Sequence, residues 1–115
     1  MVEKKNLKQE VGFAERLFQY RKVGTMNGHM LNVLSAENRT LAFHTHADSD
    51  ELFYCIEGAF DIEFEDGMTH LGEGDFIIIP RGTRHRPVCK GPVKCLLIEQ
   101  EGTLNPGNTG GTYEA

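Results

Sequence analysis

Residues 44–88 read HTHADSDELFYCIEGAFDIEFEDGMTHLGEGDFIIIPRGTRHRPV. Apolar and acidic side chains alternate strictly over residues 60–65, which is the period of a β-strand with one buried face. Turn-forming residues interrupt the apolar segments at 66–67, 72–75 and 80–82. Short strands separated by such turns, at intervals of roughly 8–12 residues, predict an all-β sandwich or barrel.

The same periodicity continues on both sides of this stretch. It predicts strands at residues 31–33, 40–46, 51–57, 60–65, 68–71, 76–79, 84–88 and 93–99. We therefore expect one barrel over residues 28–99. Residues 1–27 are expected to form an N-terminal arm or short helix that Asn6 can cap, and the Gly-rich residues 100–115 a tail or strap.

Composition restricts the function classes. The chain has 115 residues, enough for one domain, and a formal net charge of −5 with no basic cluster, which argues against nucleic-acid or anionic-membrane partners. The longest apolar run, Phe76 to Ile79, is far too short to span a bilayer, and no apolar signal segment follows Met1. We expect a cytoplasmic protein whose Cys55, Cys89 and Cys95 are reduced thiols.

Three imidazoles and one carboxylate are candidate metal ligands. His44 and His46 lie two residues apart in a period-two segment, so both should project from one strand face. A turn over residues 47–50 can bring Glu51 alongside them, and His85 follows a later turn. Such a nitrogen and oxygen set suits a first-row divalent metal, and four protein ligands on an octahedral ion leave two positions open.

These residues also resemble a known family. His44-x-His46-x4-Glu51-x6-Gly58 matches the first motif of the cupin superfamily, and Gly74-x5-Pro80-x-Gly82-x2-His85 matches the second. The fifteen residues between the motifs resemble the short spacing of compact microbial cupins. Residues 96–108, LLIEQEGTLNPGN, are similar to the ending of a small bacterial group often labelled mannose-6-phosphate-isomerase-like. The resemblance implies a double-stranded β-helix, or jelly-roll, cupin barrel with His44, His46, Glu51 and His85 as metal ligands.

Two positions depart from the family pattern. The first motif usually opens with Gly, where this chain has Asn38, a residue that tolerates left-handed backbone. The second motif often ends with Asn, where this chain has Cys89. Neither change removes a ligand.

Residues in phase with the expected ligands should line the cavity and make its wall apolar. They are Ala42, Phe53, Cys55 and Cys89. His29 and His70 have no motif support and are expected outside the site.

The expected cofactor is one divalent transition metal, either Fe, Mn, Ni or Zn. Two classes of function remain open: a metalloenzyme of oxygenase or isomerase type acting on a small polar molecule, and a non-catalytic module that binds a sugar or a carboxylate. An isomerase needs a separate general base, and Glu51 is the only carboxylate that the motifs place near the metal, which favours oxygen chemistry. No DNA-binding domain is expected, and small cupins commonly form homodimers.

Overall fold

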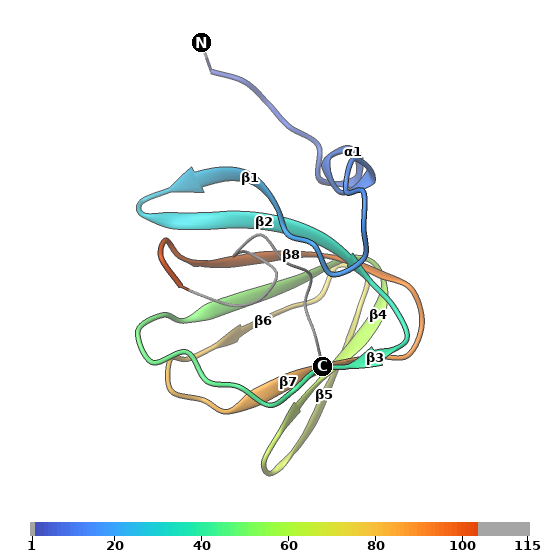
Figure 1. Ribbon diagram of the computed structural model, residues 1–115, viewed down its shortest axis with the longest axis vertical. Coiled ribbons are helices and arrows are strands. Elements are labelled where there is room, and N and C mark those ends of the chain that lie inside the picture. The colour runs from blue at the N-terminus through green and yellow to red at the C-terminus, as the bar shows by residue number, and fades with distance from the viewer. Residues whose placement is uncertain (1, 104–115) are drawn as a thin grey trace.

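The computed structural model describes residues 2–103, which form an all-β jelly-roll barrel with one short helix outside it (Figure 1). The elements are α1 (Leu7–Gly12), β1 (Arg21–Met26), β2 (His29–Ala36), β3 (Arg39–Thr40), β4 (Glu51–Phe64), β5 (Gly67–Gly72), β6 (Phe76–Ile79), β7 (His85–Cys89) and β8 (Val93–Gln100). The described residues contain no helix with the length and hydropathy that crossing a membrane requires.

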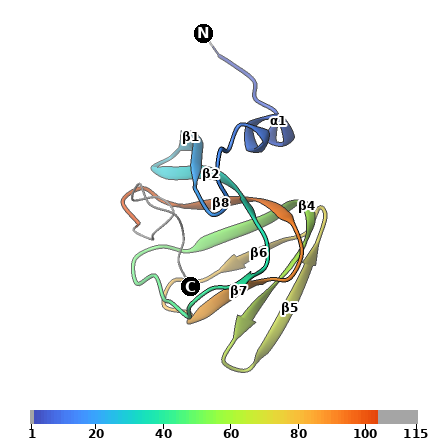
Figure 2. The ribbon, with the colours of Figure 1, turned by 45° about the vertical axis from the view of Figure 1, so that its right-hand side comes forward.

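Strand β4 belongs to both walls of the barrel. Its first half pairs with β6 on one side and with β8 on the other, and β8 continues through β2 to β1. Its second half pairs with β5 and β7, and β7 continues to β3. Every pairing is antiparallel, so the two sheets are joined through one bent strand (Figure 2).

A β-bulge makes this bend possible. The register of β4 against β8 shifts between Cys55 and Glu57, so the buried residues are odd-numbered before the shift and even-numbered after it. Gly58 follows with a φ of 87°, a left-handed conformation that glycine adopts without steric cost. A Cβ at this position would overlap with the carbonyl oxygen of Pro92. Gly58 therefore lies inside a continuous strand and does not end one.

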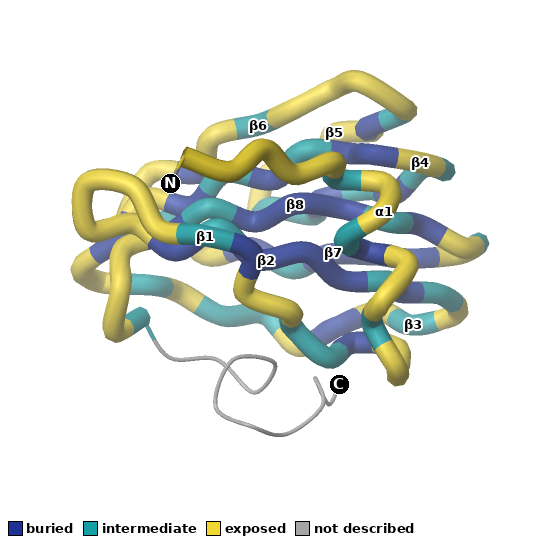
Figure 3. Tube along the Cα trace, turned by 90° about the horizontal axis from the view of Figure 1, so that it is seen from above, coloured by how far each residue is buried: buried dark blue, intermediate teal, exposed yellow. Residues whose placement is uncertain are grey.

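Two apolar clusters stabilise the fold. The inner cluster fills the barrel between the sheets and includes Phe53, Phe60, Ile62 and Leu97. The outer cluster lies on the opposite face of β2, β4 and β8 and includes Val11 of α1, which is 1% exposed. Figure 3 shows the buried stretches of β2 and β8 in dark blue. Full burial of a large apolar side chain contributes roughly 1.5–3 kcal/mol, so both faces of the first sheet contribute to stability.

Several local predictions are confirmed. Helix α1 begins as expected, because the side-chain oxygen of Asn6 accepts a 3.0 Å hydrogen bond from the Gln9 N–H. Asn38 adopts left-handed backbone with a φ of 51°, so it replaces the family's usual glycine without changing the turn.

The first sheet starts inside the segment expected to be an arm. Residues 21–26 form β1, which pairs with β2 through a two-residue turn at Asn27-Gly28. Both turn residues have positive φ, 51° and 77°, as a type I′ hairpin turn requires. The Asn-Gly dipeptide was the signal for this hairpin. Of the expected tail or strap, residues 104–115 lie outside the described residues.

The strand expected over residues 40–46 is wrong in most of its length. Regular pairing ends at Thr40, and beyond it only His44 joins β7, through an isolated bridge to His85. Because the chain leaves the sheet, the alternation of faces is lost: Leu41 and His44, three residues apart, both line the cavity, whereas Ala42 is exposed. Ala42 therefore does not line the cavity.

Replacing Gly58 by Ala should destabilise the barrel. The added Cβ meets the Pro92 carbonyl in a backbone conformation that costs a non-glycine residue about 1–3 kcal/mol. Gly91→Ala is the matched control, since it lies in the same loop as Pro92 with open space around the added atom. Urea unfolding should show a loss of at least about 1 kcal/mol for Gly58→Ala and much less for the control. Equal midpoints for the two variants would contradict this view of the bend.

Candidate metal centre

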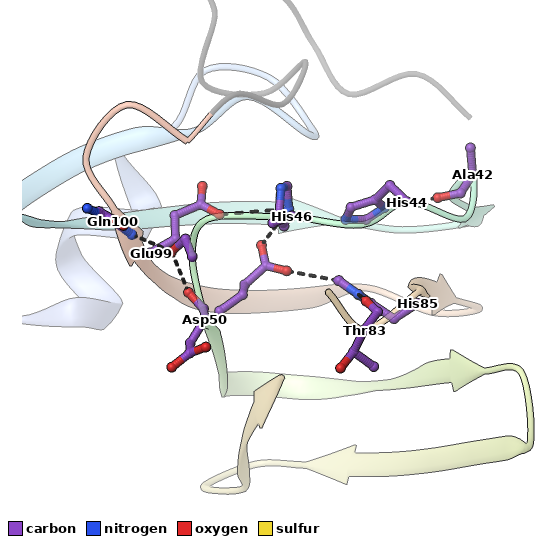
Figure 4. Close-up of polar contacts among 10 residues, drawn as sticks. Ala42, His44, His46, Asp50, Thr83, His85, Glu99 and Gln100 are labelled. Atoms are coloured by element: carbon purple, nitrogen blue, oxygen red, sulfur yellow. Dashed lines mark hydrogen bonds and ion pairs between the residues drawn. The ribbon is translucent and has the colours of Figure 1, made fainter. Parts of the chain in front are cut away.

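Backbone pairing brings two of the predicted ligands face to face. The His44 N–H donates to the His85 carbonyl at 2.9 Å, and the His85 N–H donates to the His44 carbonyl at 3.0 Å. Directly opposed residues of an antiparallel pair project their side chains to the same side. The two imidazole centroids accordingly lie 4.4 Å apart, inside the barrel (Figure 4).

Loop contacts position the other two predicted ligands. The His46 carbonyl accepts a 2.8 Å hydrogen bond from the Gly82 N–H. Ser49 Oγ donates to the Asp50 carbonyl and accepts a 2.8 Å hydrogen bond from the Gln100 N–H, which ties the loop to the end of β8. These contacts fix the loop in place, and with it the position of Glu51 at the start of β4.

Hydrogen bonds to the backbone set the tautomer of two rings. His44 Nδ1 lies 3.1 Å from the Ala42 carbonyl, and His85 Nδ1 lies 2.9 Å from the Thr83 carbonyl. A carbonyl oxygen can only accept, so each Nδ1 carries the proton. In the neutral imidazole this leaves Nε2 with a lone pair, which is the state that binds a metal.

Glu51 is the central carboxylate of the cluster. Its side chain is 2% exposed, with Oε1 2.9 Å from His85 Nε2 and Oε2 3.6 Å from His46 Nε2. Burial raises the pKa of the Glu51 carboxyl, but the close approach of His46 and the hydrogen bond with His85 outweigh burial and lower the pKa to about 2. The carboxylate is therefore ionised in the barrel interior and needs a cationic partner.

The other two imidazoles respond differently to this carboxylate. The close approach of the Glu51 carboxylate raises the pKa of His46, whereas burial lowers the pKa of His44. His46 Nε2 is also buried and makes no hydrogen bond to any described residue. A buried nitrogen that faces a carboxylate without bonding it is the arrangement expected where a cation binds both.

The residues present fit a first-row divalent metal. Ligand atoms of His44, Glu51 and His85 all lie within 4.8 Å of one another. Three imidazoles and a carboxylate form the donor set that Fe, Mn, Ni and Zn accept. The structure thus brings all four predicted ligands together, and their role in coordination stays a prediction.

A second buried carboxylate, Glu99, was missed by the sequence reasoning. Glu99 is 0% exposed, lies directly opposite Glu51 in the pairing of β4 with β8, and has Oε2 4.0 Å from His46 Nε2. The expectation that Glu51 is the only carboxylate near the metal is therefore wrong. The signal was present, because Glu99 shares the inward phase of Cys95 and Leu97, where a charged residue is rare.

A small apolar cavity adjoins the cluster. It has room for about one water molecule, about 20 Å³, and its lining includes His44, Glu51, Phe53 and Cys89. Of the predicted lining residues, Phe53 and Cys89 are thus in place. Cys55 is fully buried in the same core without lining the cavity.

A larger open pocket lies on the other side of His46. Its volume is about 400 Å³, and its walls come from residues 45–49 and 100–103. His46, whose side chain is 10% exposed, lines this pocket and also faces Glu51. Molecules from solvent can therefore approach the cluster past His46.

The remaining histidines lie outside the cluster, as expected. His70 is 69% exposed and lies 2.7 Å from Asp61, and His29 bonds to the Asn27 carbonyl. The arginines near the second motif are engaged on the surface: Arg84 and Arg86 both stack on Phe43, with guanidinium carbons 4.2 Å from the ring centroid.

Comparison with known proteins agrees with this architecture. A family model described as Cupin domain matches residues 33–99. The chain belongs to the cupin family. A solved cupin-2 domain containing protein from Shewanella frigidimarina superposes with a TM-score of 0.80 at 29% identity, covering 84% of this chain and 94% of that one. The resemblance of the two motifs to cupins and the expected barrel are thereby confirmed.

Two curated relatives match this cupin in sequence. Protein SchB of Streptomyces halstedii is 30% identical over 83 residues, which cover 72% of this chain and 60% of SchB. SSO1533 of Saccharolobus solfataricus, named provisionally as a dioxygenase, is 33% identical over 63 residues, which cover 55% of this chain and 16% of that protein. This cupin therefore spans less than two thirds of the length of either relative.

The three thiols should be inert in the folded cupin. Burial, followed by the nearby Asp61 charge, raises the pKa of Cys89 to about 11, and burial raises the pKa of Cys55 and Cys95. At neutral pH a thiol with that pKa is thiolate in only about one molecule in 10⁴. Ellman's reagent should label none of the three in buffer and all three in denaturant. Rapid labelling of the folded protein would show that the barrel interior opens to solvent.

Proposed function

We propose that this cupin is a metal-dependent enzyme that oxidises a small polar molecule with dioxygen. One divalent ion is held by His44, His46, Glu51 and His85. The observation that carries the proposal is the convergence of three imidazoles on a buried carboxylate beside a small apolar cavity.

The roles of the ligands follow from their surroundings. Backbone carbonyls hold His44 and His85 in the tautomer that presents Nε2, so these rings need little reorganisation on binding. Glu51 supplies negative charge toward both sides of the cluster, through one oxygen each. His46 is the ligand next to solvent and borders the pocket from which a substrate approaches.

The cavity favours dioxygen chemistry over isomerisation. A small, mostly apolar space for about one water molecule fits a diatomic gas but not a sugar or a hydroxy acid. Fe(II) with histidine and carboxylate ligands and open positions supplies the chemistry of non-haem oxygenases. The provisional dioxygenase name of SSO1533 supports the same assignment.

An isomerase is the second candidate, and Glu99 is the residue that supports it. Isomerisation requires a base beside the substrate proton, and Glu99 is a carboxylate next to the cluster outside the predicted ligand set.

Metal content and nitric oxide binding test the proposal together. Protein purified without a histidine tag should contain iron, and its Fe(II) form should bind nitric oxide, a dioxygen surrogate, with a high-spin nitrosyl EPR signal. Zinc-loaded native protein and an Fe(II) form without this signal would favour the isomerase or the non-catalytic binding module.

We also propose that the cupin acts in the cytoplasm as a homodimer. Phe76 and Ile78 support the dimer, because both are more than half exposed on β6, at the edge of the first sheet. The three free, buried cysteines are consistent with a reducing compartment.

Replacing His85 by Ala should abolish tight metal binding. The change removes one nitrogen ligand and leaves Glu51 without its closest partner. We expect the affinity for Fe(II) or Co(II) to fall by more than about 100-fold. Loss of a residue that only supports a ligand lowers metal affinity by about 10–100-fold. His70→Ala is the control, since it removes an imidazole from the surface. Titration against a competing chelator measures both, and equal affinities would exclude His85 as a ligand.

Removing the metal should leave the cupin folded. Its core consists of two apolar clusters that do not depend on an ion, unlike a zinc finger, in which binding free energy is folding free energy. Circular dichroism should show a lower melting temperature with chelator, because an ion that binds only the folded protein stabilises it. The barrel should remain intact at room temperature. Unfolding at room temperature on chelation would make the ion structural.

A further inference from the structure

Two overlapping sets of donor atoms share Glu51. One contains His44, Glu51 and His85, and the other contains His46, Glu51 and Glu99. In each set the donor atoms lie within 4.8 Å of one another. From this juxtaposition we infer that Glu99 is a fifth protein ligand of the metal. The inference rests on the proposed metal site, and it changes that site from two open positions to one.

Strand register places the two carboxylates side by side. Glu51 and Glu99 are directly opposite each other in the pairing of β4 with β8, where Cβ atoms lie about 4.5–5.5 Å apart. Like charges in this relation are destabilising on a sheet. Both side chains are at most 2% exposed, so water does not screen them. A divalent cation between them removes the repulsion.

The surroundings of His46 independently indicate a cation between Glu51 and Glu99. Its side chain is nine-tenths buried, its Nε2 makes no hydrogen bond to a described residue, and that atom faces both carboxylates. Nε2 lies 3.6 Å from Glu51 Oε2 and 4.0 Å from Glu99 Oε2. These separations are too long for hydrogen bonds.

The separations agree with donors around one ion. With metal–ligand bonds of about 2.1 Å, neighbouring donors of an octahedral ion lie about 3.0 Å apart and opposite donors about 4.2 Å apart. The distances of 3.6 and 4.0 Å from His46 to the two carboxylates lie between these limits. Small side-chain movements are therefore sufficient for Glu99 to coordinate.

Coordination by Glu99 has two chemical consequences. Two carboxylates balance the charge of a divalent ion, so the buried centre is neutral overall. One open position admits a ligand that binds through one atom, such as nitric oxide or a single substrate oxygen. A chelating hydroxy acid needs two positions, so this ligand set selects against it.

Glu99→Gln tests the inference, with Glu101→Gln as its matched control. Gln keeps the size of Glu99 and removes its charge, whereas Glu101 is half exposed and pairs with Lys22 on the surface. Co(II) is the probe, measured by chelator competition and by its visible absorption spectrum. We expect Glu99→Gln to weaken Co(II) binding by more than about 100-fold, as for His85→Ala, and to change the spectrum. Glu101→Gln should match wild type in both, with one ion per chain throughout.

Glu99→Asp keeps the charge and is a second variant in case Glu99→Gln does not fold. It should bind Co(II) with an affinity between those of wild type and Glu99→Gln. Wild-type affinity and an unchanged spectrum in Glu99→Gln would overturn the inference, and so would two ions per wild-type chain. The failure of the underlying site is distinguishable, because in that case wild type itself binds no Co(II) and His85→Ala changes nothing.

Discussion

An ionised carboxylate inside an apolar barrel needs a cationic partner, and the interior of this cupin is arranged around that need. Glu51 is 2% exposed and lies between His46 and His85. Removing such a carboxylate from water costs several kcal/mol unless positive charge compensates it. The His85 imidazole can supply that charge only by taking up a proton at Nε2, because its Nδ1 already donates to the Thr83 carbonyl. A metal ion supplies it without protons.

Backbone register sets the geometry of this centre. Main-chain hydrogen bonds position the side chains of the centre in pairs: the bridge positions His44 and His85, and the pairing of β4 with β8 positions Glu51 and Glu99. The bulge after Cys55 then turns the rest of β4 into the second sheet, which closes the barrel around the site. Because the ligands come from strands and a tethered loop, the site does not depend on flexible side chains for its shape.

The barrel and most of the candidate site could be predicted from the sequence, because motif spacing and period-two alternation are local properties. Strand phase over residues 40–46 could not, since the alternation holds only where the chain stays in a sheet, and this chain leaves it at Thr40. Ala42 was misplaced for that reason. Glu99 was missed because its proximity to Glu51 depends on a pairing across 47 intervening positions in the chain, which no local pattern encodes. The β1–β2 hairpin, by contrast, has a local signal in the Asn27-Gly28 dipeptide, where both residues have positive φ.

The most direct test of the central claim is anomalous diffraction from crystals of the untagged protein, measured on both sides of the absorption edge of the metal found in it. We expect one anomalous peak per chain, bonded at about 2.0–2.3 Å to His44, His46, Glu51 and His85. Crystals of metal-saturated protein in which these four side chains converge without a peak, or in which the peak lies elsewhere, would contradict it.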